Sequence, residues 1–329
     1  MRSVAVLALL ALVACEPASV AEAEARRDVA WLEKHEGRES FEAMGRLADH
    51  DPHAAARLAS RTGNADVYHA AWQAHTRGGA WGGRVLRAGL ALPADIPLVV
   101  AELPKRDPRV DPFVHDVELA VGAANGPAKT AAAALLASLG SSSQAALLRL
   151  VDAPATRDAT CTGLGGADAS EDSRLVLMKA QPESRLAPAC QQALLDHATL
   201  DRRVLDWLGD AGEPELVASA ASTLECTKLS HLWERVFGSS RESIVPLEPA
   251  LAASTARCEV TLDPVLSRAL LATPRVRASV LRVLDSDAIR PDELTSTCKQ
   301  LPRLAHGRSI PDDVRTLAST LLSKRCNKV

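Results

Sequence analysis

Histidines in the first third of the chain are the first candidates for metal binding or catalysis. The stretch His35-Glu36-Gly37-Arg38-Glu39 begins like the zinc-binding pattern H-E-x-x-H, but Glu39 stands where the second histidine is needed. Since that pattern requires two imidazoles on one helix face, we expect a solvated helix surface here. Further histidines could still converge on a metal ion or a reacting group: His50, His53, His69 and His75.

The sequence around His50 and His53 also has a structural explanation. These residues flank Asp51-Pro52, where a capping carboxylate precedes a proline suited to the first helical turn. We therefore predict no metal and no cofactor. An enzyme, or an enzyme's accessory subunit, that uses this histidine-containing section remains an alternative.

Two glycine-rich runs lack the surroundings of phosphate and calcium sites. Residues 78–83 follow a helical segment and not a strand, so we expect a helix–helix turn with Trp81 packed over it. Residues 163–172 contain clustered carboxylates without the alternating spacing of a calcium loop. The chain has no G-x-S-x-G elbow and no cysteine in the setting of a nucleophile. We predict that the protein is not an enzyme.

Six cysteines follow Cys15, with successive separations of 29, 36, 32, 40 and 28 residues. An even number in an exported chain favours disulfides, and the short and long gaps alternate. Pairing across the short gaps joins Cys161 to Cys190, Cys226 to Cys258, and Cys298 to Cys326. Buried free thiols are the alternative. Zinc is disfavoured because no two cysteines have C-x-x-C spacing.

Composition favours helices throughout. Ala and Leu dominate, while the chain has four Ile, three Phe and one Tyr, so the β-branched and aromatic residues typical of strands are scarce apart from Val. The net charge of −3 gives no reason to expect nucleic acid as a partner. Charge is uneven, however: residues 274–329 carry six acidic and eleven basic side chains. A basic surface of this kind can attract an acidic partner or anionic lipid, or can simply be solvated.

The first fifteen residues are organised as an export signal. Arg2 precedes an apolar run over residues 4–13, which is too short to cross roughly 30 Å of hydrocarbon. The run ends in Leu12-Val13-Ala14-Cys15, which resembles the lipobox of bacterial lipoproteins. The resemblance implies that residues 1–14 are a cleaved signal peptide and that Cys15 carries a diacylglyceryl group on its sulfur. An ordinary signal peptide with a chance cysteine is the alternative.

The same resemblance implies a lipid-anchored protein of the bacterial cell envelope. Residues 15–28 contain few large apolar residues, so we expect a lipidated tether that becomes helical towards its end. Glu16 follows the cysteine in place of the aspartate that lipoproteins use for retention at the inner membrane. This difference favours the outer membrane.

Several segments predict short amphipathic helices. The apolar residues of the last helix fit the i, i+3, i+4, i+7, i+8 template: Val314, Leu317, Ala318, Leu321 and Leu322. Asp263-Pro264 predicts a helix start like that at Asp51-Pro52, and Pro311 predicts another. Five prolines between residues 93 and 112 exclude a long helix there. We expect this stretch to be a bend between an N-terminal helical section, 29–92, and a C-terminal one, 113–329.

The segments that begin at Asp201, Pro274 and Asp312 resemble the helix starts of HEAT-like repeats, with their D/P-x-V-R-x-x-A-x-x-x-L pattern. The resemblance covers residues 113–329 and implies an α-solenoid of stacked helix pairs. Such pairs bury their apolar faces only against the next pair, which leaves a long exposed surface for binding.

These observations predict a membrane-anchored lipoprotein whose helical-repeat surface binds or scaffolds another envelope protein without catalysis. The basic excess points to Arg275, Arg277 and Arg282 as binding residues. A structural spacer without a specific ligand is a further alternative. A cleft that joins the four histidines would favour an enzyme, whereas a concave groove lined by Trp and Arg would favour a binding surface.

Overall fold

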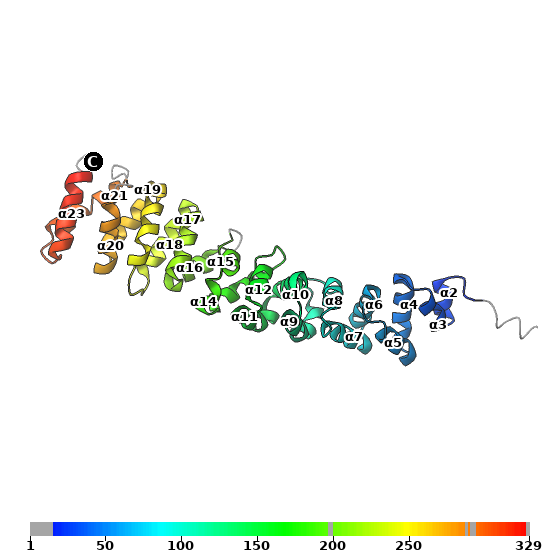
Figure 1. Ribbon diagram of the computed structural model, residues 1–329. Coiled ribbons are helices and arrows are strands. Elements are labelled where there is room, and N and C mark those ends of the chain that lie inside the picture. Colours follow the sequence, from blue (N-terminus) through cyan, green and yellow to red (C-terminus); the bar gives the residue numbers. More distant parts are fainter. Residues whose placement is uncertain (1–15, 197–199, 287–288, 290–293, 327–329) are drawn as a thin grey trace, which may run out of the picture. The chain divides into compact units, whose positions relative to one another are not determined.

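The computed structural model describes residues 16–196, 200–286, 289 and 294–326. Cys15 and the predicted signal peptide, residues 1–14, lie outside the described residues. Every regular element of the described residues is a helix, as the composition predicts (Figure 1). The contacts divide the chain into two compact units between Val176 and Leu177, and each is described by itself.

Unit 1 consists of short helices. Its elements are α2 (Val20–Ala25), α3 (Val29–Lys34), α4 (Arg38–Ala48), α5 (Pro52–Ala59), α6 (Ala65–Thr76), α7 (Ala80–Leu90), α8 (Ile96–Glu102), the 3₁₀ helix η1 (Pro108–Phe113), α9 (Val114–Ala123), α10 (Gly126–Ser138), η2 (Gly140–Ser143), α11 (Gln144–Asp152), α12 (Arg157–Leu164) and α13 (Glu171–Arg174). The 3₁₀ helix η3 (Leu175–Lys179) crosses the boundary.

Helices of unit 1 pack against their near neighbours in sequence. Along one row α4, α6, α8, α10 and α12 each contact the next, and α7, α9 and α11 do the same along another. Phe41, Tyr68 and Phe113 are fully buried within this packing. The proline-rich stretch 93–112 contains α8 and part of η1, and α8 contacts both α6 and α10. This stretch therefore lies within unit 1.

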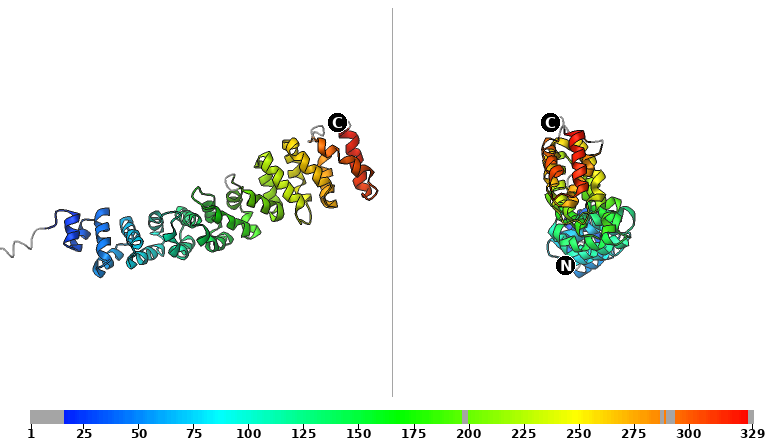
Figure 2. Two further views of the ribbon diagram at one scale, coloured as in Figure 1. Left: turned by 180° about the vertical axis from the view of Figure 1, so that it is seen from behind. Right: turned by 90° about the vertical axis from the view of Figure 1, so that its left-hand side faces the viewer.

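Unit 2 contains α14 (Pro182–Arg185), α15 (Pro188–Leu195), α16 (Arg202–Ala211), α17 (Pro214–Thr223), α18 (Cys226–Gly238), the 3₁₀ helix η4 (Val245–Leu247), α19 (Glu248–Leu270), α20 (Pro274–Leu284), α21 (Thr295–Cys298), α22 (Leu301–His306) and α23 (Asp312–Arg325). Helices α18, α19 and α20 contact one another in chain order and lie side by side (Figure 2). Trp233 on α18 is fully buried in the core of this unit.

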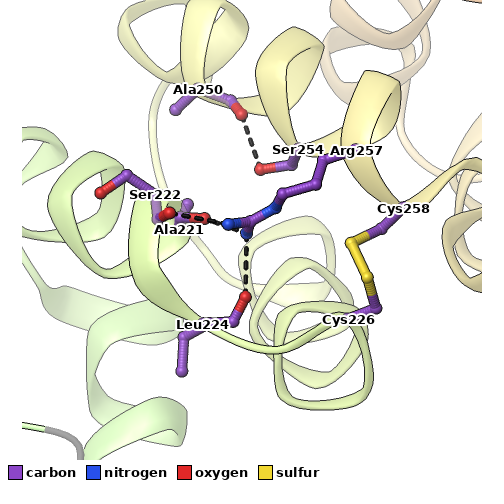
Figure 3. Close-up of a disulfide and its surroundings, with 8 residues drawn as sticks. All are labelled: Ala221, Ser222, Leu224, Cys226, Ala250, Ser254, Arg257 and Cys258. Atoms are coloured by element: carbon purple, nitrogen blue, oxygen red, sulfur yellow. Dashed lines mark hydrogen bonds between the residues drawn. A yellow bond between two sulfur atoms is a disulfide. The ribbon is translucent and has the colours of Figure 1, made fainter.

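The two described disulfides have the pairing that the spacing predicts. Cys226 at the start of α18 is bonded to Cys258, and Cys298 on α21 is bonded to Cys326 after α23. Cys258 interrupts α19 with non-helical backbone angles. Next to it, Arg257 donates hydrogen bonds to backbone carbonyls near the end of α17. The α17–α18 turn is therefore held to α19 by these hydrogen bonds and by the disulfide (Figure 3). Cys161 lies in unit 1 and Cys190 in unit 2, both are buried, and their pairing stays a prediction.

One predicted helix start is wrong. Asp51 does cap α5, because its carboxylate accepts the His53 backbone N–H at 2.8 Å with Pro52 in the first turn. Asp263-Pro264, by contrast, lies inside α19. The Asp263 carboxylate instead accepts the backbone N–H groups that open α21, those of Ser296 at 2.7 Å and Thr297 at 2.8 Å. The capping chemistry is as expected, but it serves a helix more than thirty residues further on.

Candidate binding grooves

Two of the four histidines that could have formed a chemical site, His69 and His75, have separate partners. His69 Nδ1 lies 2.8 Å from Glu102 Oε2, and His69 Nε2 lies 3.2 Å from Glu42 Oε1. His75 Nε2 lies 3.2 Å from the carbonyl oxygen of Arg109, and its ring meets Phe113 edge-on. His50 and His53 are exposed near the α4–α5 turn. Across the ranges that the structure describes, no three His, Cys, Asp or Glu side chains are arranged to hold a metal ion.

Unit 1 has a groove between α5 and α7, which we call the α5–α7 groove. Its volume is about 390 Å³, and it is lined by Pro52, Ala55, Ala56, Ala59, Thr62, Trp81, Arg84, Val85 and Ala88. On each helix the lining residues follow the i, i+3, i+4, i+7 spacing, which places them on one face. The groove is therefore a channel between two matched helical stripes, one of small residues and one that includes a tryptophan and an arginine.

Trp81 is fixed at one side of this groove. Its side chain is only 5% exposed, and its indole N–H donates to Asp49 Oδ1 at 3.2 Å. Gly82 allows α7 to lie against α6, because a Cβ at this position would collide with the carbonyl group of Ala71. The turn predicted over residues 78–83 is shorter in the structure. Gly78 has a positive φ of 86°, but α7 already begins at Ala80.

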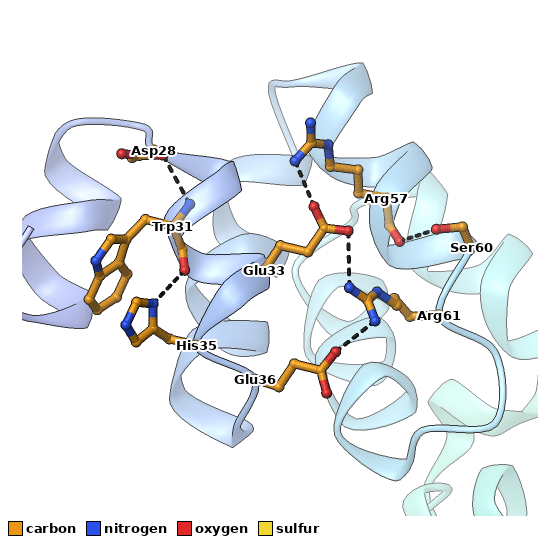
Figure 4. Close-up of polar contacts among 8 residues, drawn as sticks. All are labelled: Asp28, Trp31, Glu33, His35, Glu36, Arg57, Ser60 and Arg61. Atoms are coloured by element: carbon orange, nitrogen blue, oxygen red, sulfur yellow. Dashed lines mark hydrogen bonds and ion pairs between the residues drawn. The ribbon is translucent and has the colours of Figure 1, made fainter. Parts of the chain in front are cut away.

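The opposite wall, α5, and the residues just after it are held by ion pairs to α3 and the turn that follows α3. Glu33 accepts hydrogen bonds from Arg57 at 2.6 Å and Arg61 at 3.2 Å, and Glu36 accepts one from Arg61 at 2.6 Å (Figure 4). Single exposed pairs contribute little, but a network that shares its charges is better ordered. The charges of Arg57 on α5 and of Arg61 just after it are therefore balanced within unit 1.

Arg84 is different. It is exposed on α7 and lines the groove. It makes no ion pair with any residue that the structure describes. The neighbouring arginines are paired: Arg77, at the end of α6, with Asp49, and Arg87 on α7 with Asp116. The groove thus combines an apolar lining with one uncompensated positive charge.

Two further grooves are built in the same way. One lies between α8 and α10, has a volume of about 750 Å³ and is lined mostly by Pro, Ala, Val and Leu, with Lys105 at its edge. The other, in unit 2, lies between α18 and α19 and measures about 230 Å³. Their cations are already engaged, because Lys105 pairs with Asp168 and Arg268 pairs with Glu234.

The arginines predicted to bind a partner make internal contacts. Arg275 donates to the carbonyl of Glu242 at 2.6 Å, and Arg282 pairs with Glu248 at 2.6 Å. Arg277 is half-buried and donates to the carbonyls of Leu270 at 2.8 Å and Ala272 at 3.1 Å. A role of these three residues in binding stays a prediction. The grooves were not found from the sequence, although the stripe at residues 52, 55, 56 and 59 is a readable signal.

Among the described residues, every helix is too short or too polar to span a bilayer. The chain matches no family model, no curated protein and no solved structure.

Proposed function

We propose that the protein is a lipid-anchored lipoprotein of the bacterial envelope whose helical-repeat surface binds another envelope protein without catalysis. The observation that carries this proposal is the α5–α7 groove, whose mostly apolar lining includes the exposed Arg84 and rests on the buried Trp81. Arginine is among the residue types that most often dominate the energy of protein interfaces. Grooves of this volume fall within the range of binding sites in general.

A HEAT-like solenoid is the architecture we propose for the helices. Two helices of unit 2 support it, since each begins with proline and carries an arginine three residues later. Arg185 donates to the carbonyls of Met178 and Ala180, and Arg277 donates to those of Leu270 and Ala272. Both arginines therefore reach back seven and five residues to the end of the preceding element. Recurrence of one local contact at two helix starts is typical of a repeat.

The anchor in this proposal is Cys15. Two or more acyl chains give stable membrane attachment, whereas one chain gives only marginal binding. We expect Cys15→Ser to remain as an unprocessed precursor without incorporated lipid. Metabolic labelling with an alkyne-bearing palmitate analogue, together with the mass of the mature N-terminus, measures this. Normal lipid labelling of the variant would contradict the anchor.

Crosslinking in intact cells tests the binding part of the proposal. We expect an amine-reactive crosslinker to join the protein to peptides of a specific envelope protein, identified by mass spectrometry. If lipidated protein at its natural level yields only crosslinks within itself, it is a spacer and not a binding protein.

A further inference from the structure

We propose that the α5–α7 groove holds an amphipathic helix of the partner protein, with the helix's apolar residues in the channel and one of its carboxylates on Arg84. This inference rests on the proposed binding function and names the chemistry of the partner's segment. It is carried by the shape of the groove and by the single charge in its lining.

The shape fits a helix. Each wall presents residues i to i+7, a length of about 10 Å at 1.5 Å per residue. On α5 the wall includes three alanines, of which Ala56 and Ala59 are exposed. Small residues allow an incoming backbone to approach closely, and large apolar side chains of that helix can then fill the channel. A helix laid into an apolar groove with anchors at i, i+3, i+4 and i+7 is a recurring mode of peptide recognition.

The charge specifies an acidic residue on the incoming helix. Around the groove the other cations are compensated: Arg57 and Arg61 by Glu33 and Glu36, Arg77 by Asp49, and Arg87 by Asp116. Arg84 alone among these arginines has no ion-pair partner in the part of the chain that the structure describes. A guanidinium group at the edge of an apolar surface binds a carboxylate through a charge-assisted hydrogen bond. The pairing sets the register of the helix in the channel.

The comparison with the other two grooves strengthens the assignment. Their cations, Lys105 and Arg268, are paired with carboxylates of the same chain, so an acidic ligand would have to displace Asp168 or Glu234. At the α5–α7 groove no such exchange is needed. Of these three grooves, it is the one whose charge and apolar lining are both available to a partner.

A displayed peptide library tests the inference. The probe is a library of helical 14-residue peptides, randomised along one face and at the flanking positions, selected on the purified lipidated protein in detergent. We expect large apolar residues at i, i+3, i+4 and i+7 together with an enriched Asp or Glu. On Arg84→Glu the same library should enrich Lys or Arg at that position, and an acidic peptide selected on the wild type should bind about five- to tenfold more weakly.

Two controls separate the groove from general charge and stability effects. Arg303→Glu reverses an exposed arginine on α22 that also makes no ion pair among the described residues, and it should leave the selected sequences unchanged. Ala56→Trp fills the channel at an exposed position and should abolish enrichment, whereas Ala30→Trp on α3 should not. Circular dichroism and thermal melting establish that each variant is folded.

The inference would be overturned if acidic peptides were still selected on Arg84→Glu. It would also be overturned if no selected sequence were lost on Ala56→Trp. Arg84-dependent binding of oleate without peptide enrichment would also overturn it, because the occupant would then be a fatty acid. Crosslinking to an envelope protein through other surfaces would leave the proposed binding function standing even in these cases.

Discussion

At the residue scale, ion pairs between alternate helices, such as α3 with α5, α7 with α9 and α9 with α11, are a recurring polar contact of unit 1. Glu118 on α9 shows their effect on titration. A hydrogen bond from Arg149 on α11 lowers the pKa of the Glu118 carboxyl, and this effect exceeds the opposing influence of burial. Because the pKa is lower in the folded state than in the unfolded chain, the pair stabilises the fold above the ordinary pKa of glutamate. That stabilisation is lost as pH falls through the folded-state value.

We therefore expect Glu118→Gln to lower the free energy of unfolding more at about pH 6 than at about pH 3, because protonation of the carboxyl weakens the pair as pH falls. Urea denaturation followed by circular dichroism at the two pH values measures the difference. Glu39→Gln, at an exposed position on α4, is the control. A Glu118→Gln effect that is equal at both pH values would show that the charge of Glu118 is not what matters.

Arg277 illustrates why a sequence can identify an important residue and leave its role open. The D/P-x-V-R pattern singles out Arg277, and the basic excess suggests a binding role. In the structure its guanidinium group satisfies carbonyl oxygens at the end of α19. Which carbonyls lack a helical partner depends on where α19 ends, and its kink and length are not visible in the local sequence.

We expect Arg277→Ala to destabilise the protein by about 1–3 kcal/mol, because partly buried carbonyl groups lose their hydrogen-bond donors. Arg303→Ala, at an exposed position, should cost less than about 0.5 kcal/mol. Chemical denaturation of the two variants provides the comparison. Equal stability of both would assign Arg277 to the surface and return it to the candidate binding residues.

At the element scale, much of the fold can be predicted from local signals. The scarcity of Ile, Phe and Tyr predicts an all-α fold, and the alternating cysteine gaps predict the pairs Cys226–Cys258 and Cys298–Cys326. The grooves cannot be predicted in the same way. Trp81 and Ala56 are 25 residues apart, and their common channel depends on how α5 and α7 pack around α4 and α6.

The Cys226–Cys258 bond closes a loop of about 32 residues, which in the chain-entropy account stabilises the fold by about 3–4 kcal/mol. We expect Cys226→Ala together with Cys258→Ala to lower the stability by roughly that amount. Denaturation of oxidised wild type and of the double variant measures it. Arg257→Ala should cost less, because it removes hydrogen bonds to the α17–α18 turn but leaves the covalent link. If the double variant is as stable as the wild type, the bond does not constrain unit 2.

At the scale of the whole molecule, we propose a lipid anchor at Cys15 and a partner-binding groove between α5 and α7. The alternative is a chemical site built from the N-terminal histidines. In the structure His69 and His75 contact different partners, Glu102 and the carbonyl of Arg109. Histidine substitutions therefore separate the two accounts. His50→Ala with His53→Ala changes exposed residues that do not line the groove.

Site-specific photocrosslinking in living cells tests whether the α5–α7 groove binds an acidic amphipathic helix of an envelope protein. A benzoylphenylalanine at position 59, in the groove, should give a discrete adduct with one envelope protein, attached through an apolar helical segment that carries an Asp or Glu. The adduct should be lost in Arg84→Glu, should persist in the His50→Ala, His53→Ala variant, and should not form from position 30. An adduct that survives Arg84→Glu and disappears with the histidine substitutions would show that Arg84 does not bind the partner and that the N-terminal histidines are needed for function.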